Sequence, residues 1–185
     1  MKRVAFVLLL AFGYVFSVFG QSLNDFQLEV NSGEITITGY TGQYRDVVIP
    51  ESINGMPVVA IGRQAFAFSQ LTSVYIPDSV SYIGFGAFAF NHLTSITIPN
   101  SVSHIGNSAF TRNQLASVYI GNSVSHIGNG AFSYNQLADV SIPNSVFHLA
   151  RNAFWNNKLT SVYVPNSVSQ LARNAFDRNV SITRY

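Results

Sequence analysis

Three histidines occupy one repeated position in the sequence and could together bind a transition metal. His104, His126 and His148 recur at one fixed spacing. Imidazole nitrogens are common ligands of Zn and Cu, and stacked units would bring neighbouring rings about 5 Å apart. Each histidine, however, precedes an Ile or Leu that is expected to point inward, and no acidic residue shares the column to orient the rings. We therefore expect a solvated polar row, with no bound metal and no other cofactor, and keep these three residues as the metal candidates that the sequence offers.

Nucleophilic and acid–base chemistry have less support. The chain has no Cys, which excludes a thiolate nucleophile and a disulfide framework. Serines recur at the same spacing from Ser79 to Ser167, so none is distinguished from its equivalents by a base and an orienting acid. The eight acidic residues are scattered, and the G-x-G segments lack the third glycine and the strand-to-helix setting of a phosphate-binding loop. The sequence predicts a protein that is not an enzyme.

These positions belong to a 22-residue repeat that runs through most of the chain. Four apolar columns recur at this spacing, and the most regular one places Ala–Phe pairs so that the phenylalanines are Phe66, Phe88, Phe110, Phe132, Phe154 and Phe176. Within a unit, the residues "TSVYIP" at 72–77 alternate polar and apolar side chains, which is typical of a short, half-buried strand. The segment that follows, such as residues 122–132, has no helical period and predicts an irregular turn with at most a short helical or 3₁₀ segment.

A single unit of this kind cannot bury its apolar side chains alone, so neighbouring units must stack. The sequence therefore predicts a β-rich solenoid with one parallel sheet, to which each coil contributes one short strand. An Asn column (Asn91, Asn113, Asn135, Asn157 and Asn179) is expected to point inward and bond loop backbone; exposed turn asparagines are the alternative. A Gly column that starts at Gly62 changes to Ala in the last two coils, which favours close packing over a need for positive φ.

Units such as "LTSVYIPDSVSYIGFGAF" at 71–88 resemble the BspA-like leucine-rich repeats of bacterial surface and secreted proteins. The segments "GEITITGYTG" at 33–42 and "VVIPESINGMPVVAIGRQAF" at 47–66 are similar to the N-terminal hairpin and first coil of that family. The resemblance covers about residues 33–182 and implies a leucine-rich-repeat solenoid. It also implies a role in adhesion or in binding proteins of a host or neighbouring cell. Many relatives carry Cys where this chain has Asn.

The chain divides into three segments. Residues 1–20 open with Lys2 and Arg3, continue as an apolar run and end at small residues, which predicts a signal peptide cleaved after Gly20. A retained membrane anchor is the alternative reading of this segment. Residues 21–45 are expected to form a β-hairpin cap, and residues 46–185 a solenoid of six coils. The product would be secreted, periplasmic or displayed on the cell surface.

The outward side chains of the predicted strands offer a binding surface. The candidate ligand-binding residues are Tyr75, Thr97, Tyr119, Asp139 and Tyr163, with Tyr on every second coil, about 10 Å apart. Tyrosine is enriched at interface hot spots because it buries area cheaply and keeps a hydroxyl to pair. It is also simply a good strand former, which is the alternative explanation of the row. We expect a protein partner at this face, and a repetitive glycan would use the same row.

Charge limits the other partners. Lys2 and Arg3 account for two of the ten basic residues, so residues 21–185 hold eight basic and eight acidic side chains. A neutral segment predicts no nucleic-acid partner, because such binding needs a basic face. Six of the acidic residues lie in 21–110 and six of the basic residues in 111–185. This split favours head-to-tail self-association, so that a structural or self-assembling role in the cell envelope is the alternative to a binding module.

Overall fold

A computed structural model describes residues 8–9, 15–16 and 21–185 of the chain. Most of the expected signal peptide, residues 1–20, lies outside the described residues; the exceptions are strands β1 (Leu8–Leu9) and β2 (Val15–Phe16), which pair antiparallel. In the described part of the chain, no helix has the length and apolar character needed to span a bilayer.

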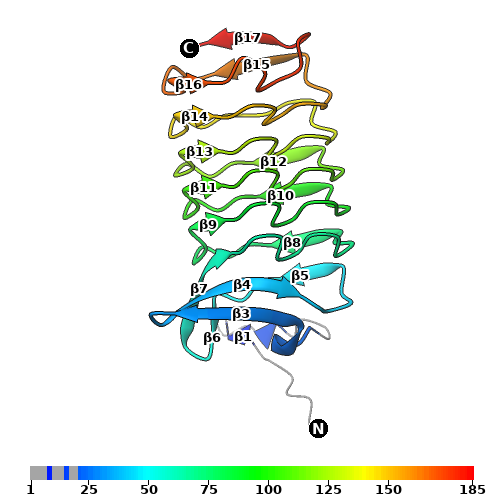
Figure 1. The fold of residues 1–185 in the computed structure, drawn as a ribbon, viewed down its shortest axis with the longest axis vertical. Coiled ribbons are helices and arrows are strands. Elements are labelled where there is room, and N and C mark those ends of the chain that lie inside the picture. The colour runs from blue at the N-terminus through cyan, green and yellow to red at the C-terminus, as the bar shows by residue number, and fades with distance from the viewer. Residues whose placement is uncertain (1–7, 10–14, 17–20) are drawn as a thin grey trace.

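The body of the molecule is a stack of coils that wind from the N-terminal end to the C-terminal end (Figure 1). One side of the stack is a nine-stranded sheet in which equivalent residues of successive coils pair in parallel, as His104 does with His126. The strands that recur in it once per coil are β9 (Tyr82–Ile83), β11 (His104–Ile105), β13 (His126–Ile127), β14 (His148–Leu149) and β16 (Gln170–Leu171). These strands were not expected, because the sequence predicted an irregular or short helical segment here.

The strands that the sequence did predict lie on a second side of the stack (Figure 1). They are β5 (Asp46–Val48), β8 (Ser73–Tyr75), β10 (Ser95–Thr97), β12 (Ser117–Tyr119), β15 (Ser161–Val164) and β17 (Ser181–Arg184). They form three separate parallel pairs, β5–β8, β10–β12 and β15–β17, and residues 139–141 form no strand. The prediction of one continuous parallel sheet on this side was therefore wrong. The continuous pairing is in the nine-stranded sheet, where two-residue strands are held in register by backbone bonds to both neighbours.

The repeated apolar columns form the core, as the sequence predicted. Neighbouring Phe rings stack between Phe66 and Phe176 with centroids 5.1 to 5.5 Å apart and planes within 10° of parallel. Rings from Phe66 to Phe154 are fully buried. One solenoid layer thus repeats about every 5 Å, close to the spacing of paired strands.

The Asn column points inward and connects the coils. Asn135 accepts a bond from the Leu115 N–H at 3.0 Å and donates to the carbonyls of Phe110 and Phe132, both at 3.0 Å. Asn91, Asn113 and Asn157 make equivalent bonds. The predicted ladder is confirmed for these four residues, but Asn179 is exposed and stands outside it.

The Gly column allows neighbouring coils to pack closely, as its change to Ala in the last two coils indicated. Gly106 has no positive φ, and a Cβ added there would lie 2.6 Å from the carbonyl carbon of Gly84. Close approach of neighbouring coils, and not backbone conformation, therefore requires a small residue at this position.

A hairpin covers the N-terminal end of the stack (Figure 1). A short 3₁₀ turn, η1 (Leu23–Asp25), leads into β3 (Phe26–Asn31), which pairs antiparallel with β4 (Glu34–Tyr40). Strand β4 then pairs in parallel with β7 (Met56–Ile61), so the hairpin continues the nine-stranded sheet; β6 (Ser52–Ile53) also pairs with β7. The rings of Phe26 and Tyr40 contact Phe66, which places an apolar layer over the first coil.

Candidate functional site

The predicted binding residues lie on the outward side of the second set of strands, which we call the tyrosine face. Tyr75, Tyr119 and Tyr163 come from β8, β12 and β15 and are 54%, 49% and 65% exposed. Thr97, from β10, is exposed beside Tyr119, with which it is in register. Asp139 is also exposed but lies outside any strand. The outward side chains between the tyrosines are mostly Ser and Thr, so small polar residues surround each ring.

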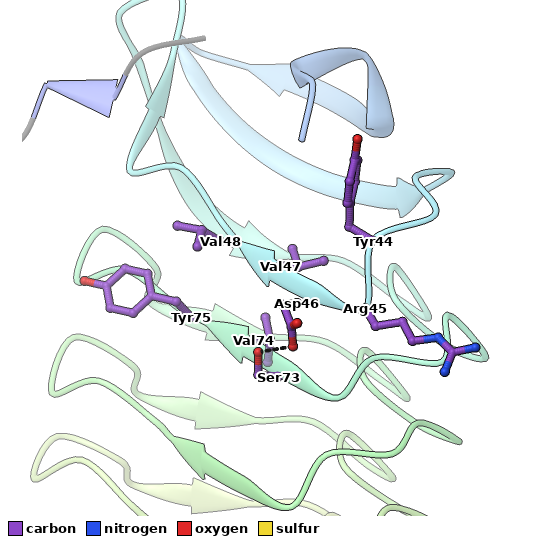
Figure 2. Close-up of a pocket in the computed structure, with 8 residues that line it drawn as sticks. All are labelled: Tyr44, Arg45, Asp46, Val47, Val48, Ser73, Val74 and Tyr75. Atoms are coloured by element: carbon purple, nitrogen blue, oxygen red, sulfur yellow. Dashed lines mark hydrogen bonds between the residues drawn. The ribbon is translucent and has the colours of Figure 1, made fainter. Parts of the chain in front are cut away.

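The N-terminal end of this face contains a shallow hollow of about 470 Å³ (Figure 2). Residues 44–48 and 73–75 line it. Figure 2 shows the Tyr75 ring and the Arg45 side chain pointing in opposite directions, with Asp46 between them. The Asp46 carboxylate accepts bonds from the hydroxyls of Thr72 and Ser73 at 2.8 and 2.7 Å. These donors fix the carboxylate at one point in the lining of the hollow.

A second opening of about 180 Å³ lies between β8 and β10. These two strands are neighbours in the stack but belong to different pairs. Tyr75 and Thr97 both line the opening, together with the backbone around them. The break in strand pairing therefore leaves a small opening in the tyrosine face beside Tyr75.

The local environment shifts two pKa values at this end of the face. Partial burial, with the negative charges of Asp78 and Glu51, raises the pKa of the Tyr75 hydroxyl above its ordinary value. Tyr75 is therefore a neutral hydrogen-bond donor and acceptor at physiological pH. The hydroxyls of Ser73 and Thr72 lower the pKa of Asp46, because they bond to its charged form. The arrangement suits recognition by hydrogen bonds and aromatic contact.

Sequence reasoning missed Tyr44, Arg45 and Asp46. The signal was present, because "DVVIP" at 46–50 has the pattern of "SVYIP" at 73–77. The strand itself was predicted, but its outward residues were left out of the binding face, which was read from the regularly spaced coils; Asp46 and its partner Ser73 are farther apart than Ser95 and Ser117. The extra residues form the β6–β7 hairpin, whose Asn54–Gly55 turn has positive φ at both positions.

The histidine candidates lie on the outward side of the nine-stranded sheet, away from the tyrosine face. The rings of His104 and His126 stack with centroids 4.3 Å apart, and those of His126 and His148 are 5.7 Å apart. The Nδ1 atoms of the three rings already have hydrogen-bond partners, in the hydroxyls of Ser103 and Ser125 at 2.8 Å and in the Gln170 side-chain oxygen at 2.6 Å. Within residues 8–9, 15–16 and 21–185, no group of three or more His, Cys, Asp or Glu has the arrangement of a metal site.

Two of the repeated serines, Ser101 and Ser145, bond to backbone, and the Ser79 hydroxyl is buried without a hydrogen-bond partner among the described residues. The hydroxyls of Ser101 and Ser145 donate to the carbonyls of Val80 and Val124 in the preceding coil, both at 2.7 Å. Each bond joins a coil to its neighbour at the turn after the predicted strand. This is a structural use of the hydroxyl, in which its proton is held by a carbonyl and not by a base.

Comparison with known proteins places this geometry in a family. The model of the BspA type leucine rich repeat region matches residues 59–183 in six copies. A leucine rich repeat protein of T. pallidum, TpLRR, has a similar structure, with a TM-score of 0.69 and 28% sequence identity over 88% of this chain and 85% of that chain. No curated protein matches the sequence.

Two further solved structures share the solenoid. A leucine rich cell surface protein of Faecalibacterium prausnitzii has a TM-score of 0.65 and 28% identity over 89% of this chain, which spans 54% of that protein. The pneumococcal vaccine antigen PcpA has a TM-score of 0.62 over 90% of this chain and 52% of its own, at 18% identity, and shows the fold alone. The repeat columns, the stacked coils and the family model agree, and the chain belongs to the BspA-type leucine-rich repeat family.

Proposed function

We propose that this protein is an exported, non-catalytic module that binds another protein through its tyrosine face at the bacterial cell surface. The observation that carries the proposal is the regular exposure of Tyr75, Tyr119 and Tyr163 on alternate coils among small polar residues. Rigid aromatic side chains lose little entropy on binding and contribute area and a hydroxyl. A surface location is supported by the F. prausnitzii relative, which is described as a cell surface protein.

The hollow at Asp46 supports the same proposal. Its carboxylate is held by two hydroxyls and stays charged because its pKa is lowered. A partner side chain that carries a positive charge could therefore enter beside Tyr75 and pair with a fixed acceptor. An interface needs such a specific point in addition to aromatic contact area.

The experiment is affinity capture by the purified chain from envelope and extracellular fractions, followed by measurement of the captured protein with variants. The triple variant Tyr75→Ser, Tyr119→Ser and Tyr163→Ser should reduce affinity by at least about tenfold, because it removes three anchors. Tyr82→Ser is the matched control, since Tyr82 is 46% exposed on the nine-stranded sheet. Equal affinity of the triple variant and the control would contradict the proposal.

A self-assembling envelope protein is the second candidate. The observation in its favour is the separation of charge, with six acidic residues in 21–110 and six basic residues in 111–185. Head-to-tail contact would bring opposite charges together and would weaken as salt screens them. Sedimentation at low and high salt distinguishes the candidates: a salt-sensitive oligomer unaffected by the tyrosine variants supports assembly, and a monomer that loses its partner with those variants supports recognition.

A further inference from the structure

A third side of each coil, the segment that returns from the nine-stranded sheet to the next predicted strand, collects most of the positive charge. We call the outward side of these segments the return face; they are residues 63–70, 85–92, 107–114, 129–136, 151–158 and 173–179. Backbone bonds hold the segments in register, as between the Gln64 N–H and the Phe85 carbonyl at 2.8 Å and between the Phe66 N–H and the Ala87 carbonyl at 2.8 Å. Equivalent side chains therefore stand one above another.

The return face is basic although residues 21–185 are neutral as a whole. Six of their eight basic residues lie on it, all exposed: Arg63, Arg112, Arg151, Lys158, Arg173 and Arg178. Asp177 is its one acidic residue, and the Asp177 carboxylate already accepts a backbone bond from Asn156 at 2.9 Å. Four of the six, Arg151, Lys158, Arg173 and Arg178, lie on the last two coils, which are about 5 Å apart, so the charges of these two coils can act together within the screening length of about 8 Å at physiological salt.

Aromatic side chains interleave with these charges. The rings of Phe68 and Phe90 stack at 4.4 Å, and the Arg112 guanidinium lies 5.6 Å from the Phe90 ring and 4.4 Å from the Tyr134 ring. Trp155 stands perpendicular to Tyr134 at 4.9 Å. Stacking of this kind holds a guanidinium flat and leaves its N–H edge free for an anion.

The backbone at this column has an unusual conformation for such residues. Phe68, Phe90, Arg112 and Tyr134 all have φ between 54° and 59°. This left-handed region favours Gly or Asn, and Asn156 occupies the equivalent position in the next coil at φ 57°. Four bulky side chains are kept at a position where they cost conformational energy, which points to a use for their exposed ends.

A hollow of about 300 Å³ opens on the return face between the last two coils. Asn152, Trp155, Asn174, Phe176 and Arg178 line it. The buried Phe176 ring gives an apolar floor, and the indole of Trp155, which is 38% exposed, gives a wall. The Asn174 side-chain Nδ2 donates to the Asn152 side-chain Oδ1 at 2.9 Å. The Asn152 Nδ2 and the Asn174 Oδ1 take no part in that bond. The hollow therefore offers an aromatic surface, an amide donor, an amide acceptor and a guanidinium.

A second hollow of about 360 Å³ is lined mainly by residues 148–151 and 170–172, which come just before Asn152 and Asn174 in the chain. Its lining includes Arg151, His148 and Gln170. Arg151 and Arg173 occupy equivalent positions on successive coils and directly precede Asn152 and Asn174 of the first hollow, so two like charges stand in register next to it in the chain. Like charges in register repel, and an anionic ligand that lies across them would relieve this repulsion.

We propose that the return face binds an acidic polysaccharide, with one sugar unit in the hollow at Trp155 and its carboxylate or sulfate groups on Arg151, Arg173 and Arg178. Sugar hydroxyls both donate and accept hydrogen bonds, which matches the amides of Asn152 and Asn174. A nucleic acid fits less well, because successive bases need a row of free aromatic faces to stack on, whereas Phe90 already stacks on Phe68 and the Arg112 guanidinium lies over the rings of Phe90 and Tyr134. The site is separate from the tyrosine face and does not depend on the function proposed for that face.

The test is binding of the purified chain to polygalacturonate, a carboxylated polysaccharide, with neutral dextran and a single-stranded oligo-dT as comparisons. Polygalacturonate should bind, with an affinity that falls as salt rises, and dextran should not. The triple variant Arg151→Gln, Arg173→Gln and Arg178→Gln should lose at least about tenfold in affinity, because each charge-assisted contact is strong. Arg184→Gln, which removes an exposed charge from β17, should keep the wild-type affinity.

The aromatic wall is tested by a second pair of variants. Trp155→Ser should weaken polygalacturonate binding, whereas Tyr82→Ser, which removes an exposed ring from the nine-stranded sheet, should not change it. Oligo-dT binding as tight as polygalacturonate binding would overturn the proposal in favour of a nucleic-acid partner. Equal affinities of the triple arginine variant and the Arg184→Gln variant would overturn it as well. Circular dichroism of each variant verifies that the solenoid is intact.

Discussion

Replacement of Asn135 by Leu measures how strongly one amide joins three coils. Asn135 is 5% exposed, and Leu has nearly the same size but can neither donate nor accept. The substitution leaves the Leu115 N–H without the acceptor that it has at 3.0 Å. The Phe110 and Phe132 carbonyls each lose one donor but keep another, from Asn113 at 3.2 Å and from Asn157 at 3.0 Å. The change therefore orphans one group and weakens two.

The magnitude follows from these counts. An orphaned buried N–H costs about 1–3 kcal/mol, and each lost bond to a carbonyl that keeps a second donor costs about 0.5–1 kcal/mol. We expect Asn135→Leu to lower the free energy of unfolding by about 2–5 kcal/mol, measured by urea denaturation with circular dichroism. Asn179→Leu is the matched control, because Asn179 belongs to the same column but is exposed; its effect should stay below about 0.5 kcal/mol.

Asn135→Asp separates hydrogen bonding from shape. The Asp side chain keeps the acceptor for Leu115 but turns an oxygen toward the Phe110 and Phe132 carbonyls, so its charged form is disfavoured and its pKa rises in the folded state. A group whose folded pKa is raised binds protons more readily when folded, so this variant should become more stable, relative to the wild type, as pH falls toward about 4. A loss below about 0.5 kcal/mol for Asn135→Leu, or no pH-dependent recovery of Asn135→Asp, would refute the ladder as a source of stability.

Three other substitutions test the packing and the histidine stack. Phe110→Ala should cost about 3–5 kcal/mol in urea denaturation, because it removes a fully buried ring from the stack; a loss below about 1 kcal/mol would contradict a close-packed column. Gly106→Ala should cost about 1–3 kcal/mol, since the added Cβ meets the Gly84 backbone at 2.6 Å; unchanged stability would mean that the coils can separate freely. Burial, with the charges of the two neighbouring imidazoles, lowers the pKa of His126, so the unfolded chain binds the proton more readily. Stability should therefore fall as pH drops below about 6.5, and His126→Gln should reduce that fall; identical denaturation midpoints of variant and wild type at pH 5 and pH 7.5 would argue against it.

The sequence was sufficient to predict the solenoid, its Phe core and most of the Asn ladder. These features depend on residues such as Phe110 and Asn135 that repeat at a fixed interval, and equivalent residues of stacked coils must lie one above another. The nine-stranded sheet was missed because each of its recurring strands, such as His126–Ile127, has two residues. Such a strand is too short for an alternation of polar and apolar side chains to be visible.

The candidate surfaces were only partly predictable. The tyrosine face followed from alternation in "TSVYIP", but the Asp46 hollow required knowledge that a hairpin separates the first strand from the regular repeat. The basic return face was missed because the charges were summed along the chain, which cancels Arg151 against acidic residues on other sides of the stack. Assigning each charge to its position in the repeat unit would have separated them.

The bonds between coils also determine how the protein can change in length. Backbone bonds such as Ser103 N–H to Ser81 carbonyl and Ser125 N–H to Ser103 carbonyl join positions one repeat apart. Duplication of any whole repeat unit would give the new coil ready-made partners on both sides, and would lengthen the molecule by about 5 Å. Gain or loss of a segment that is one residue too short or too long would instead misalign every core column beyond the change. In-frame recombination between units can thus enlarge or shorten the exposed surfaces during evolution while each remaining layer keeps its original neighbours.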